Sequence, residues 1–395
     1  MSTLGIGIIG CGNISAAYLR LAPLFRGIEV RAVADINAEA AAARAEEFDV
    51  TALDVNSLLA ARDIDVIVNL TIPAAHFDVT RSILEAGKHA FSEKPLVLTL
   101  EQGKELAALA ANKGLRIGSA PDTFLGGVHQ QARDIIDQGS IGRVVAGTAH
   151  VMSHGMEHWH PNPDFFFQPG AGPVLDIGPY YITNLIQLIG PVKRVGALTS
   201  SASATRTILS EPRAGEVIPV NTPTNIHALL EFDQGATITL SASWDVWSHR
   251  HAPMELYGTE GSLYVPDPNF FGGKLEQAGS DQEIIEVESW DHPFGVANQD
   301  LDTENSKANY RTAGLADMAN SIAAGKPHRC ALDLAVHATD VMTSILKSGE
   351  TGSFVEMTTS CKRPEPLDPE AASALLAPTA SDAAEQPGDE ERQGQ

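Results

Sequence analysis

The sequence predicts an α/β protein built from a doubly wound parallel sheet and a second, α+β domain with a large, mostly antiparallel open sheet. Strand-like and helix-like runs alternate over the first 120 residues, which is typical of a parallel sheet covered on both faces. After about residue 140, short glycine-bearing turns join strand-like runs directly, which indicates antiparallel pairing. A length of 395 residues, 43% of them apolar, is enough for two such cores.

The first domain, residues 1–120, is predicted from runs that each carry a boundary signal. Short β-rich runs bounded by Gly, Asp or Pro predict strands over residues 5–9, 28–34, 65–70, 88–92 and 115–119. Helical patterns lie between them, over residues 15–21, 38–48, 76–86 and 99–113. Gly87 and Gly114 follow the last two helices, at the position where glycine ends a helix.

The second domain, residues 121–355, has a different pattern. Predicted strands cover residues 144–151, 225–232, 236–243, 254–257 and 262–265, and hairpin turns lie at 233–235 and 258–261. Two amphipathic helices follow, with apolar positions at Leu315, Met318 and Ile322 and then at Leu334, Ala338, Val341 and Ile345. We expect these helices to end at Gly325 and Gly349.

The end of the chain, residues 364–395, is predicted to be an acidic and mostly disordered tail, with a short helix over residues 370–377. It carries eight acidic residues, one basic residue and no aromatic residue. Such a segment buries too little apolar surface to offset its ordering entropy. We therefore expect truncation after Arg363 to leave activity intact.

Charge and composition exclude several classes of function. The formal net charge of −23 repels polyphosphates and anionic lipids, so we expect neither nucleic acid nor a membrane as partner. Cys11, Cys330 and Cys361 are far apart and form no C-x-x-C pair, which excludes a disulfide scaffold. The sequence shows neither a spanning run nor a basic leader, and we expect a cytoplasmic protein.

A glycine-rich loop at residues 10–15, GCGNIS, joins the first predicted strand to the first predicted helix. Gly10 permits the tight turn and Gly12 lets the backbone approach a pyrophosphate, which the helix N-terminus at Asn13 and Ile14 attracts. Asp35 ends the second strand about 20 residues later, where an acid binds a ribose hydroxyl pair. Because that acid repels a 2′-phosphate, the prediction is a dinucleotide site that prefers NAD over NADP.

A second set of polar residues follows the next two strands at the same sheet edge. Glu93-Lys94-Pro95 comes after the strand at 88–92, and Thr71, Pro73 and His76 come after the strand at 65–70. The carboxyl edge of an open parallel sheet is where its ligands bind. We therefore expect these residues to contact the cofactor, with Lys94 also facing the substrate.

The glycine loop, Asp35, residues 71–76, the run AGKHAFSEKP at 86–95 and the two hairpin turns together resemble the Gfo/Idh/MocA family of nicotinamide-dependent sugar and polyol oxidoreductases. The resemblance covers residues 4–355. It implies that Lys94 hydrogen-bonds the reacting hydroxyl or carbonyl beside the nicotinamide. It also implies a homodimer or homotetramer formed through the open sheet face of the second domain.

The family's Asp-x-Gly-x-His motif matches residues 176–180 only in part, since Asp176 and Gly178 agree but Tyr180 replaces the histidine. Spacing of i and i+4 predicts that Asp176 and Tyr180 share one helix face. Three proton acceptors stay open: Tyr180 with its pKa lowered by Lys94 and NAD, Lys94 assisted by Asp176, or a histidine from residues 153–161. We rank the set of Lys94, Asp176 and Tyr180 above His160 or His158.

Residues near that histidine segment complete the predicted substrate wall. His158, His160, Asp176 and Asp122 are predicted to hold substrate hydroxyls, and Trp159 offers a platform for a sugar ring. Asp122 could equally cap a helix before Phe124. His154, His158 and His160 include zinc-type ligands, but their proline-rich surroundings indicate a loop, and we expect no metal.

These features predict reversible hydride transfer between NAD and a secondary alcohol of a sugar, glycoside or cyclic polyol. Two alternatives stay open: a glycosidase that uses NAD transiently, and a non-catalytic regulator that senses NAD or a sugar. Glu93, Lys94 and Asp176 argue against the regulator, because a sensor has no need of them.

Overall fold

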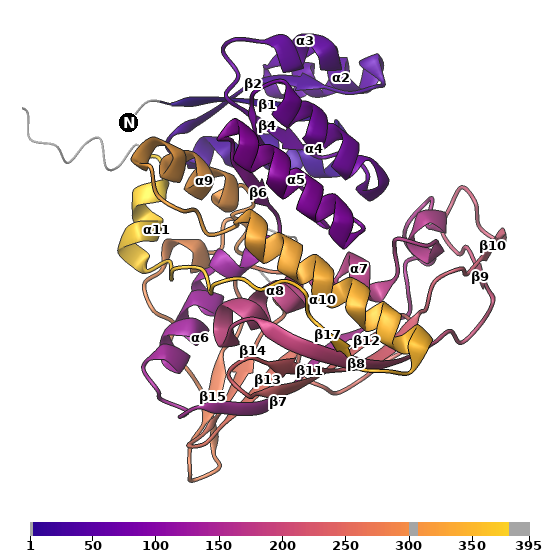
Figure 1. Cartoon of the computed structure of the whole chain (residues 1–395), viewed down its shortest axis with the longest axis vertical. Helices are drawn as coiled ribbons and strands as arrows, with labels where there is room; N and C mark the ends of the chain where they lie inside the picture. The colour runs from indigo at the N-terminus through magenta and orange to yellow at the C-terminus, as the bar shows by residue number, and fades with distance from the viewer. Residues whose placement is uncertain (1–2, 300–306, 379–395) are drawn as a thin grey trace, which may run out of the picture.

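The computed structural model describes residues 3–299 and 307–378. Figure 1 shows the N-terminal sheet and its helices above a broad second sheet, with α10 (Leu332–Thr351) crossing between the two layers. No helix in the described ranges is long and apolar enough to cross a membrane.

The N-terminal sheet is a six-stranded parallel sheet in the order β3-β2-β1-β4-β5-β6. Its strands are β1 (Leu4–Ile9), β2 (Ile28–Ala34), β3 (Thr51–Leu53), β4 (Val66–Asn69), β5 (His89–Ser92) and β6 (Ile117–Ser119). Its helices are α1 (Asn13–Leu21), α2 (Ala38–Phe48), α3 (Val55–Ala60), α4 (His76–Glu85) and α5 (Leu100–Lys113). The strand order reverses beside β1 and β4, so a crevice for a ligand opens at the carboxyl ends of these strands. This confirms the predicted doubly wound, Rossmann-type sheet.

Local signals explain why most of these elements form where the sequence predicts them. Thr99 and Gln102 form a reciprocal capping box at the start of α5, and Gly114 ends the helix at φ +65°. The elements that sequence reasoning missed, β3 and α3, are short. β3 is largely exposed and therefore carries no alternating apolar pattern.

The second sheet has nine strands in the order β16-β15-β14-β13-β7-β12-β11-β8-β17, and β7 and β12 form its parallel pair. Its strands are β7 (Val144–Met152), β8 (Val192–Ser200), β11 (Asn225–Phe232), β12 (Thr237–Ser243), β13 (Met254–Gly258), β14 (Ser262–Val265), β15 (Glu276–Ala278), β16 (Ile284–Glu286) and β17 (Val355–Glu356). A ribbon of β9 (Thr205–Thr207) and β10 (Val217–Pro219) extends from it. The large, mostly antiparallel sheet is confirmed.

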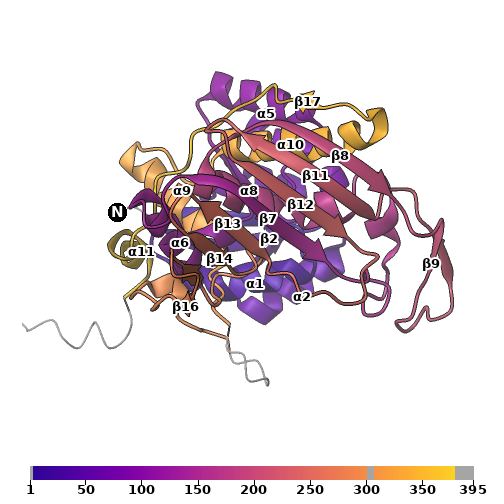
Figure 2. The ribbon, with the colours of Figure 1, turned by 90° about the horizontal axis from the view of Figure 1, so that it is seen from below.

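Helices cover one face of this sheet. They are α6 (Gly127–Asp137), α7 (Pro173–Asp176), α8 (Gly178–Ile189) and α10, while α9 (Ala313–Ala324) packs beside β6 of the first sheet. Figure 2 shows β8, β11, β12, β7 and β13 side by side in front of these helices, with their other face uncovered. The predicted end of α10 at Gly349 is wrong: a Cβ there would lie 2.2 Å from Thr199, so this glycine serves packing, and Gly352 at φ +67° ends the helix.

The disordered tail predicted at 364–395 is also wrong over residues 364–378, and residues 379–395 lie outside the described ranges. The short helix is present as α11 (Pro369–Leu375), where Leu367, Ala372 and Leu375 are buried. The backbone N–H of Arg26 donates to the Leu375 carbonyl at 2.8 Å. Sequence reasoning missed this packing because three buried side chains in an acidic, proline-rich segment leave no periodic signal.

Candidate active site

The glycine loop between β1 and α1 has the geometry of a phosphate cradle. Gly10 adopts φ +106°, and a Cβ there would lie 2.6 Å from the Leu70 backbone, so only glycine fits. At Gly12, which has ordinary φ −71°, an added Cβ would meet nothing within 4 Å. Asn13 is exposed and, with Ile14, begins α1, whose N-terminus has no side-chain cap. These residues fit a pyrophosphate, because the uncapped first turn of α1 offers backbone N–H groups and the positive end of the helix dipole.

Asp35 stands beside this loop at the end of β2. Its carboxylate accepts hydrogen bonds from the backbone N–H groups of Cys11 at 2.7 Å and Asn37 at 2.8 Å. A carboxylate held in this way keeps further lone pairs for ribose hydroxyls. Burial and the Asp35 charge raise the pKa of the Cys11 thiol to about 11, so it stays neutral and unreactive at pH 7.

The predicted cofactor residues in the loop after β4 differ in how deeply they are buried. Thr71 is half-buried and donates to Asn69 Oδ1 at 2.7 Å, and Pro73 begins a short 3₁₀ turn over Pro73–Ala75. His76 is 1% exposed, and its ring lies 2.7 Å from the Pro95 carbonyl and 3.0 Å from the Thr71 carbonyl. The structure therefore does not support the prediction that His76 contacts the cofactor. The ring is buried and links the loops that carry Thr71 and Lys94.

Lys94 and Asp176 meet across the two layers of the molecule. Lys94 Nζ donates to Asp176 Oδ1 at 2.9 Å and to the Asp176 carbonyl at 2.6 Å. Both side chains are mostly buried, at 16% and 21% exposure. A buried ammonium held by two oxygens has a third N–H available for a substrate oxygen.

Asp176 and Tyr180 do not lie on one continuous helix as predicted. α7 ends at Asp176 and α8 begins at Gly178, because Pro179 lacks the N–H that would continue the helical hydrogen bonds. Both residues nevertheless approach Lys94, whose Nζ lies 5.3 Å from the centre of the Tyr180 ring. The structure thus brings together the three residues that we rank first as catalytic.

The charges at this site fix the protonation states of Lys94 and Tyr180. Burial alone lowers the pKa of Lys94. The negative charges of Tyr180, once it ionises at high pH, and of Asp176 and Glu93 outweigh burial and raise that pKa above its usual value. Burial raises the pKa of Tyr180 by more than the Lys94 charge lowers it. In the protein alone, the net shift of the Tyr180 pKa is thus opposite to the lowering expected from Lys94 and NAD, and both groups are protonated at pH 7.

Glu93 connects this site to the first helix. Its Oε1 accepts a hydrogen bond from the Tyr18 hydroxyl at 3.1 Å, and its Oε2 accepts one from the Lys94 backbone N–H at 2.9 Å. Both contacts fix the turn that presents Lys94. Glu93 therefore orients Lys94 through the backbone, and sequence reasoning missed the contribution of Tyr18, which only the fold brings near.

Asp122, predicted to hold substrate, is instead 2% exposed and binds the start of α9. Its Oδ2 accepts hydrogen bonds from the backbone N–H groups of Thr312 at 3.0 Å and Gly314 at 3.1 Å. Arg311, which sequence reasoning missed, lies beside it and interacts by charge with Tyr180, Asp122 and Glu93. No local motif surrounds Arg311, so the sequence carries no signal for its role.

The predicted substrate residues of the loop at 153–168 differ in their surroundings. His158 and Trp159 are exposed, with Trp159 at 57%, while His160 packs edge-on against Phe165 and Phe166. Glu157 pairs with Arg206 at 2.8 Å. Within the described ranges, no group of three or more His, Cys, Asp or Glu side chains is arranged to hold a metal ion.

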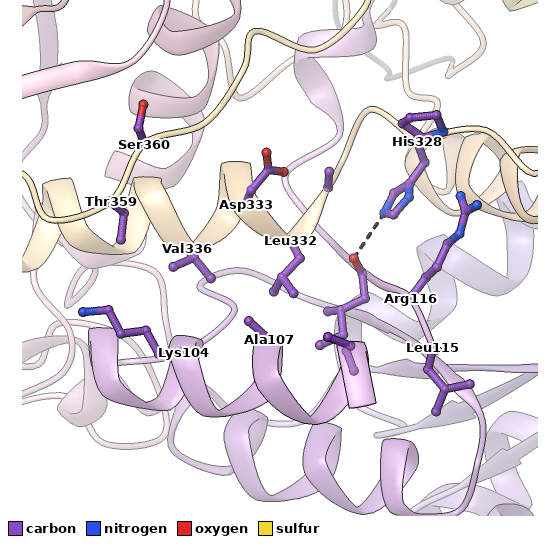
Figure 3. Close-up of a pocket in the computed structure, with 15 residues that line it drawn as sticks. Lys104, Ala107, Leu115, Arg116, His328, Leu332, Asp333, Val336, Thr359 and Ser360 are labelled. Carbon is purple, nitrogen blue, oxygen red and sulfur yellow. Dashed lines mark hydrogen bonds between the residues drawn. The ribbon is translucent and has the colours of Figure 1, made fainter. Parts of the chain in front are cut away.

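A cavity of about 660 Å³ lies elsewhere, between α5 and the start of α10. Figure 3 shows its apolar floor, with Ala107, Leu332 and Val336, and a polar rim that includes Lys104 and His328. It begins beside Ile117, at the amino end of β6, which is the edge opposite to the one that carries Lys94. Neither Lys94 nor Asp176 lines it, so this cavity is separate from the candidate active site.

Two family models match this chain. Residues 4–120 match the family described as an oxidoreductase family with an NAD-binding Rossmann fold, and residues 129–264 match the GFO/IDH/MocA C-terminal domain. The protein is thus an oxidoreductase with an NAD-binding Rossmann fold. The chain belongs to the GFO/IDH/MocA family, as the resemblance in its motifs predicts.

Individual relatives are similar to this chain at low identity. A dTDP-3,4-didehydro-2,6-dideoxy-alpha-D-glucose 3-reductase of Streptomyces violaceoruber is 29% identical over 66% of this chain and 72% of the reductase. A 1,5-anhydro-D-fructose reductase of Ensifer adhaerens is 30% identical over 43% of this chain, and that match spans about half of the reductase, 52%. An inositol 2-dehydrogenase of Salmonella typhimurium is 36% identical over 36% of this chain and 44% of that enzyme.

Solved structures share the whole architecture. An NAD-binding oxidoreductase from Klebsiella pneumoniae superposes with a TM-score of 0.78 at 20% identity, over 91% of this chain and 100% of that one. A levoglucosan dehydrogenase in complex with NADH and L-sorbose gives 0.77 at 23% identity, with the same coverage of both chains. These likenesses show the fold.

Proposed function

We propose that this protein catalyses hydride transfer between NAD and a secondary alcohol or ketone of a sugar, glycoside or cyclic polyol. The observation that carries the proposal is the ion pair of Lys94 and Asp176 beside Tyr180, with Lys94 at the same sheet edge as the phosphate cradle. Bound NAD supplies the hydride acceptor. The cradle of Gly10 and Gly12 would hold its pyrophosphate, and Asp35 its adenosine ribose.

Lys94 has the role of an electrostatic stabiliser in this proposal. As hydride leaves the alcohol carbon, negative charge develops on the substrate oxygen, and a preorganised ammonium stabilises it. Asp176 keeps Lys94 protonated and aimed, through contacts at 2.6 and 2.9 Å. A lysine held as an ammonium is a poor proton acceptor, which argues against Lys94 as the base.

Tyr180 is then the proposed proton carrier. Its raised pKa makes it a proton donor at pH 7, which suits reduction of a carbonyl. The alternative bases are less well placed, since His160 packs into an aromatic cluster and His158 is exposed. Carbonyl reduction with NADH is therefore proposed to dominate near neutral pH, and alcohol oxidation at alkaline pH.

The test is a substrate panel of inositols, free sugars and glycosides, followed at 340 nm with NAD and with NADP. Net NADH formation from an alcohol, or consumption with the matching ketone, supports the proposal. Sugar release without net NADH supports a glycosidase instead. Binding of NAD with neither reaction would overturn catalysis and leave a sensor.

The assembly is proposed to be a homodimer or homotetramer that pairs the uncovered sheet face. Leu198, Leu229 and Phe354 are exposed there at 76%, 46% and 62%, and Leu198 lies directly opposite His227 of β11. Exposed apolar side chains on one face favour association. Light scattering that compares the molar mass of Leu198→Asp with that of the wild-type protein tests this interface. An unchanged molar mass in Leu198→Asp would contradict it.

The division into residues 1–120 and 121–355 and a cytoplasmic location stay predictions. Expression of residues 1–120 alone, with NAD binding measured by calorimetry, tests the division. A folded fragment that binds NAD would support it, and an unfolded one would show that the first sheet depends on the later segments packed against it, such as Ala331 beside Gly118.

A further inference from the structure

Histidines from two neighbouring regions of the second sheet lie together on its uncovered face. Ser241 of β12 lies opposite His227 of β11 on one side and opposite His150 of β7 on the other. His227 Nδ1 lies 3.0 Å from Ser241 Oγ. Ile226 and Ala228, on either side of His227 in β11, are buried in the core. Because side chains alternate along a strand, His227 and its two in-register neighbours point away from the helices.

The segment before β13 adds two more histidines beside β7. The His251 ring stacks on His150 with ring centres 4.0 Å apart and planes 16° apart, and the His249 ring centre lies 6.0 Å from that of His251. The His150 backbone N–H donates to the Pro253 carbonyl at 2.9 Å, which fixes this segment against the strand. We call His227, His150, His251 and His249 the histidine row.

His150 is poorly prepared to carry a proton on both ring nitrogens. It is 9% exposed, and among the described residues its buried Nδ1 has no hydrogen-bond partner. A neutral imidazole can leave this nitrogen unprotonated, whereas an imidazolium has an N–H on both nitrogens. A buried N–H without an acceptor is unfavourable. The geometry around His150 therefore favours its neutral form.

The charged groups around His150 act in the same direction, with one exception. Burial lowers the pKa of His150, and the positive charges of His251, His249 and His227, once protonated, lower it further. Glu255 of β13 raises it. The Glu255 carboxylate already accepts a hydrogen bond from the Tyr257 hydroxyl at 2.7 Å. Arg250, exposed between His249 and His251, adds a permanent positive charge to the row.

The histidine row adjoins the exposed apolar side chains of the same face. Leu198 of β8 lies directly opposite His227. Leu198, His227, Leu229 and Phe354 line a hollow of about 360 Å³. Figure 2 shows β8, β11, β12 and β7, which carry these positions, side by side. A surface that covers the apolar side chains therefore also covers part of the histidine row.

The charges near this patch fit a second copy of the chain as the covering surface. Glu231 of β11 is paired within the chain, with Lys193 at 3.0 Å and with Arg194. The whole chain has a net charge of −23, so two copies repel each other unless their contact face carries little net charge. In a symmetric dimer the same patch meets itself. Neutral histidine rows are compatible with such a contact, whereas protonated rows bring like charges into one interface.

We propose that the histidine row makes association of two copies through the uncovered sheet face pH-dependent: the copies associate while the row is neutral and separate when it is protonated. This inference rests on the interface in the proposed function. A histidine whose pKa is lowered in the assembled state favours assembly above its pKa in the free chain. That contribution is lost as the pH falls below the ordinary histidine value of about 6.5.

The test measures the dissociation constant of the full chain by sedimentation and light scattering at about pH 7.5 and about pH 5.5, the range in which histidine titrates. Asp and Glu ordinarily titrate near pH 4, so this step changes mainly the histidines. The neutral variant is the double substitution His150→Gln and His251→Gln. The charged variant is His251→Lys, at an exposed position. The control is His158→Gln, which removes an exposed histidine from the loop at 153–168.

For the wild-type protein we expect the dissociation constant to rise at least about 10-fold at the lower pH, because each proton taken up on separation contributes up to a factor of about ten per pH unit. In the double variant the dissociation constant should stay near its value at pH 7.5. His251→Lys should already be separated at pH 7.5, at a concentration where the wild type is assembled. His158→Gln should respond to pH as the wild type does.

A wild-type protein that is assembled at pH 7.5 and equally assembled at pH 5.5 would overturn the role of the histidine row and leave the interface standing. The same pH response in the double variant as in the wild type would also overturn it. A wild-type protein that is monomeric at pH 7.5 would overturn the interface and this inference together, while the substrate panel tests hydride transfer independently. Circular dichroism at both pH values checks folding. If the double variant does not fold, the single variant His251→Gln replaces it.

Discussion

The cofactor half and the substrate half of the candidate site are assembled in different ways. The phosphate cradle and Asp35 lie within 26 residues of each other, on two adjacent strands of one sheet. Lys94 and Asp176 come from positions 82 residues apart and meet only where the two layers pack. The first half depends on a local motif, whereas the second depends on the whole fold, so the two halves should fail differently when perturbed.

The sharpest separation of the halves should come from Lys94→Ala. We expect turnover to fall at least about 10³-fold, because the ammonium that stabilises the developing oxyanion is lost. NAD affinity, measured by calorimetry, should change little. Lys94→Arg is the matched control that keeps the charge and alters its geometry. Substantial activity in Lys94→Ala would show that the substrate half is not built around this ion pair.

Contrary to the expectation from sequence that this segment is dispensable, removal of residues 364–395 should damage both halves together. The Leu367 backbone accepts from the His292 ring and donates to Gln130, and the Leu375 carbonyl accepts from Arg26. Burial of each fully buried leucine is worth about 1.5–3 kcal/mol before ordering entropy is subtracted. We expect truncation after Arg363 to lower the free energy of unfolding by about 3 kcal/mol in urea titrations. Truncation after Pro378 is the control, and equal stability of the two truncated proteins would contradict the packing of α11.

Gly12→Val should break only the cofactor half. A Cβ added at Gly12 meets nothing within 4 Å and the backbone is at φ −71°, so the thermal midpoint should stay near that of the wild type. The side chain would occupy the space that we assign to the pyrophosphate, and we expect NAD affinity to fall about 10²-fold, or about 2.7 kcal/mol. Calorimetric titration with NAD measures this directly. Wild-type NAD affinity in Gly12→Val would show that the dinucleotide does not bind at this loop.

The smallest expected effect is the pH dependence of the substrate half. Since the pKa of Tyr180 is raised, its neutral form persists to alkaline pH. Carbonyl reduction should be constant near neutrality and fall as pH rises through that pKa, while alcohol oxidation should rise with pH. In Tyr180→Phe, both the fall of carbonyl reduction and the rise of alcohol oxidation with pH should be lost. If its profiles keep the wild-type shape, tyrosine is not in the proton path and His160→Ala becomes the next variant to test.

Sequence reasoning located the parallel sheet, the strand boundaries around the glycine loop and the hairpins of the second sheet, because each depends on residues close in sequence. It missed β8, α6 and the short edge strands, whose patterns are weak without their neighbours. It predicted that Asp122 holds the substrate and that His76 contacts the cofactor, because both residues follow strands at the sheet edge. Both side chains are buried and bound to backbone groups that come from distant segments.

The sequence by itself determined the family, and it predicted the NAD site at the glycine loop and the catalytic set of Lys94, Asp176 and Tyr180, since each lies in a motif of a few residues. Only the tertiary structure decided that Tyr18 binds Glu93, that residues 364–378 are packed, and that Lys94 and Tyr180 are both protonated at neutral pH. The physical reason is that pKa shifts and buried contacts depend on charges and surfaces brought together from distant positions. Sequence spacing carries no record of those distances.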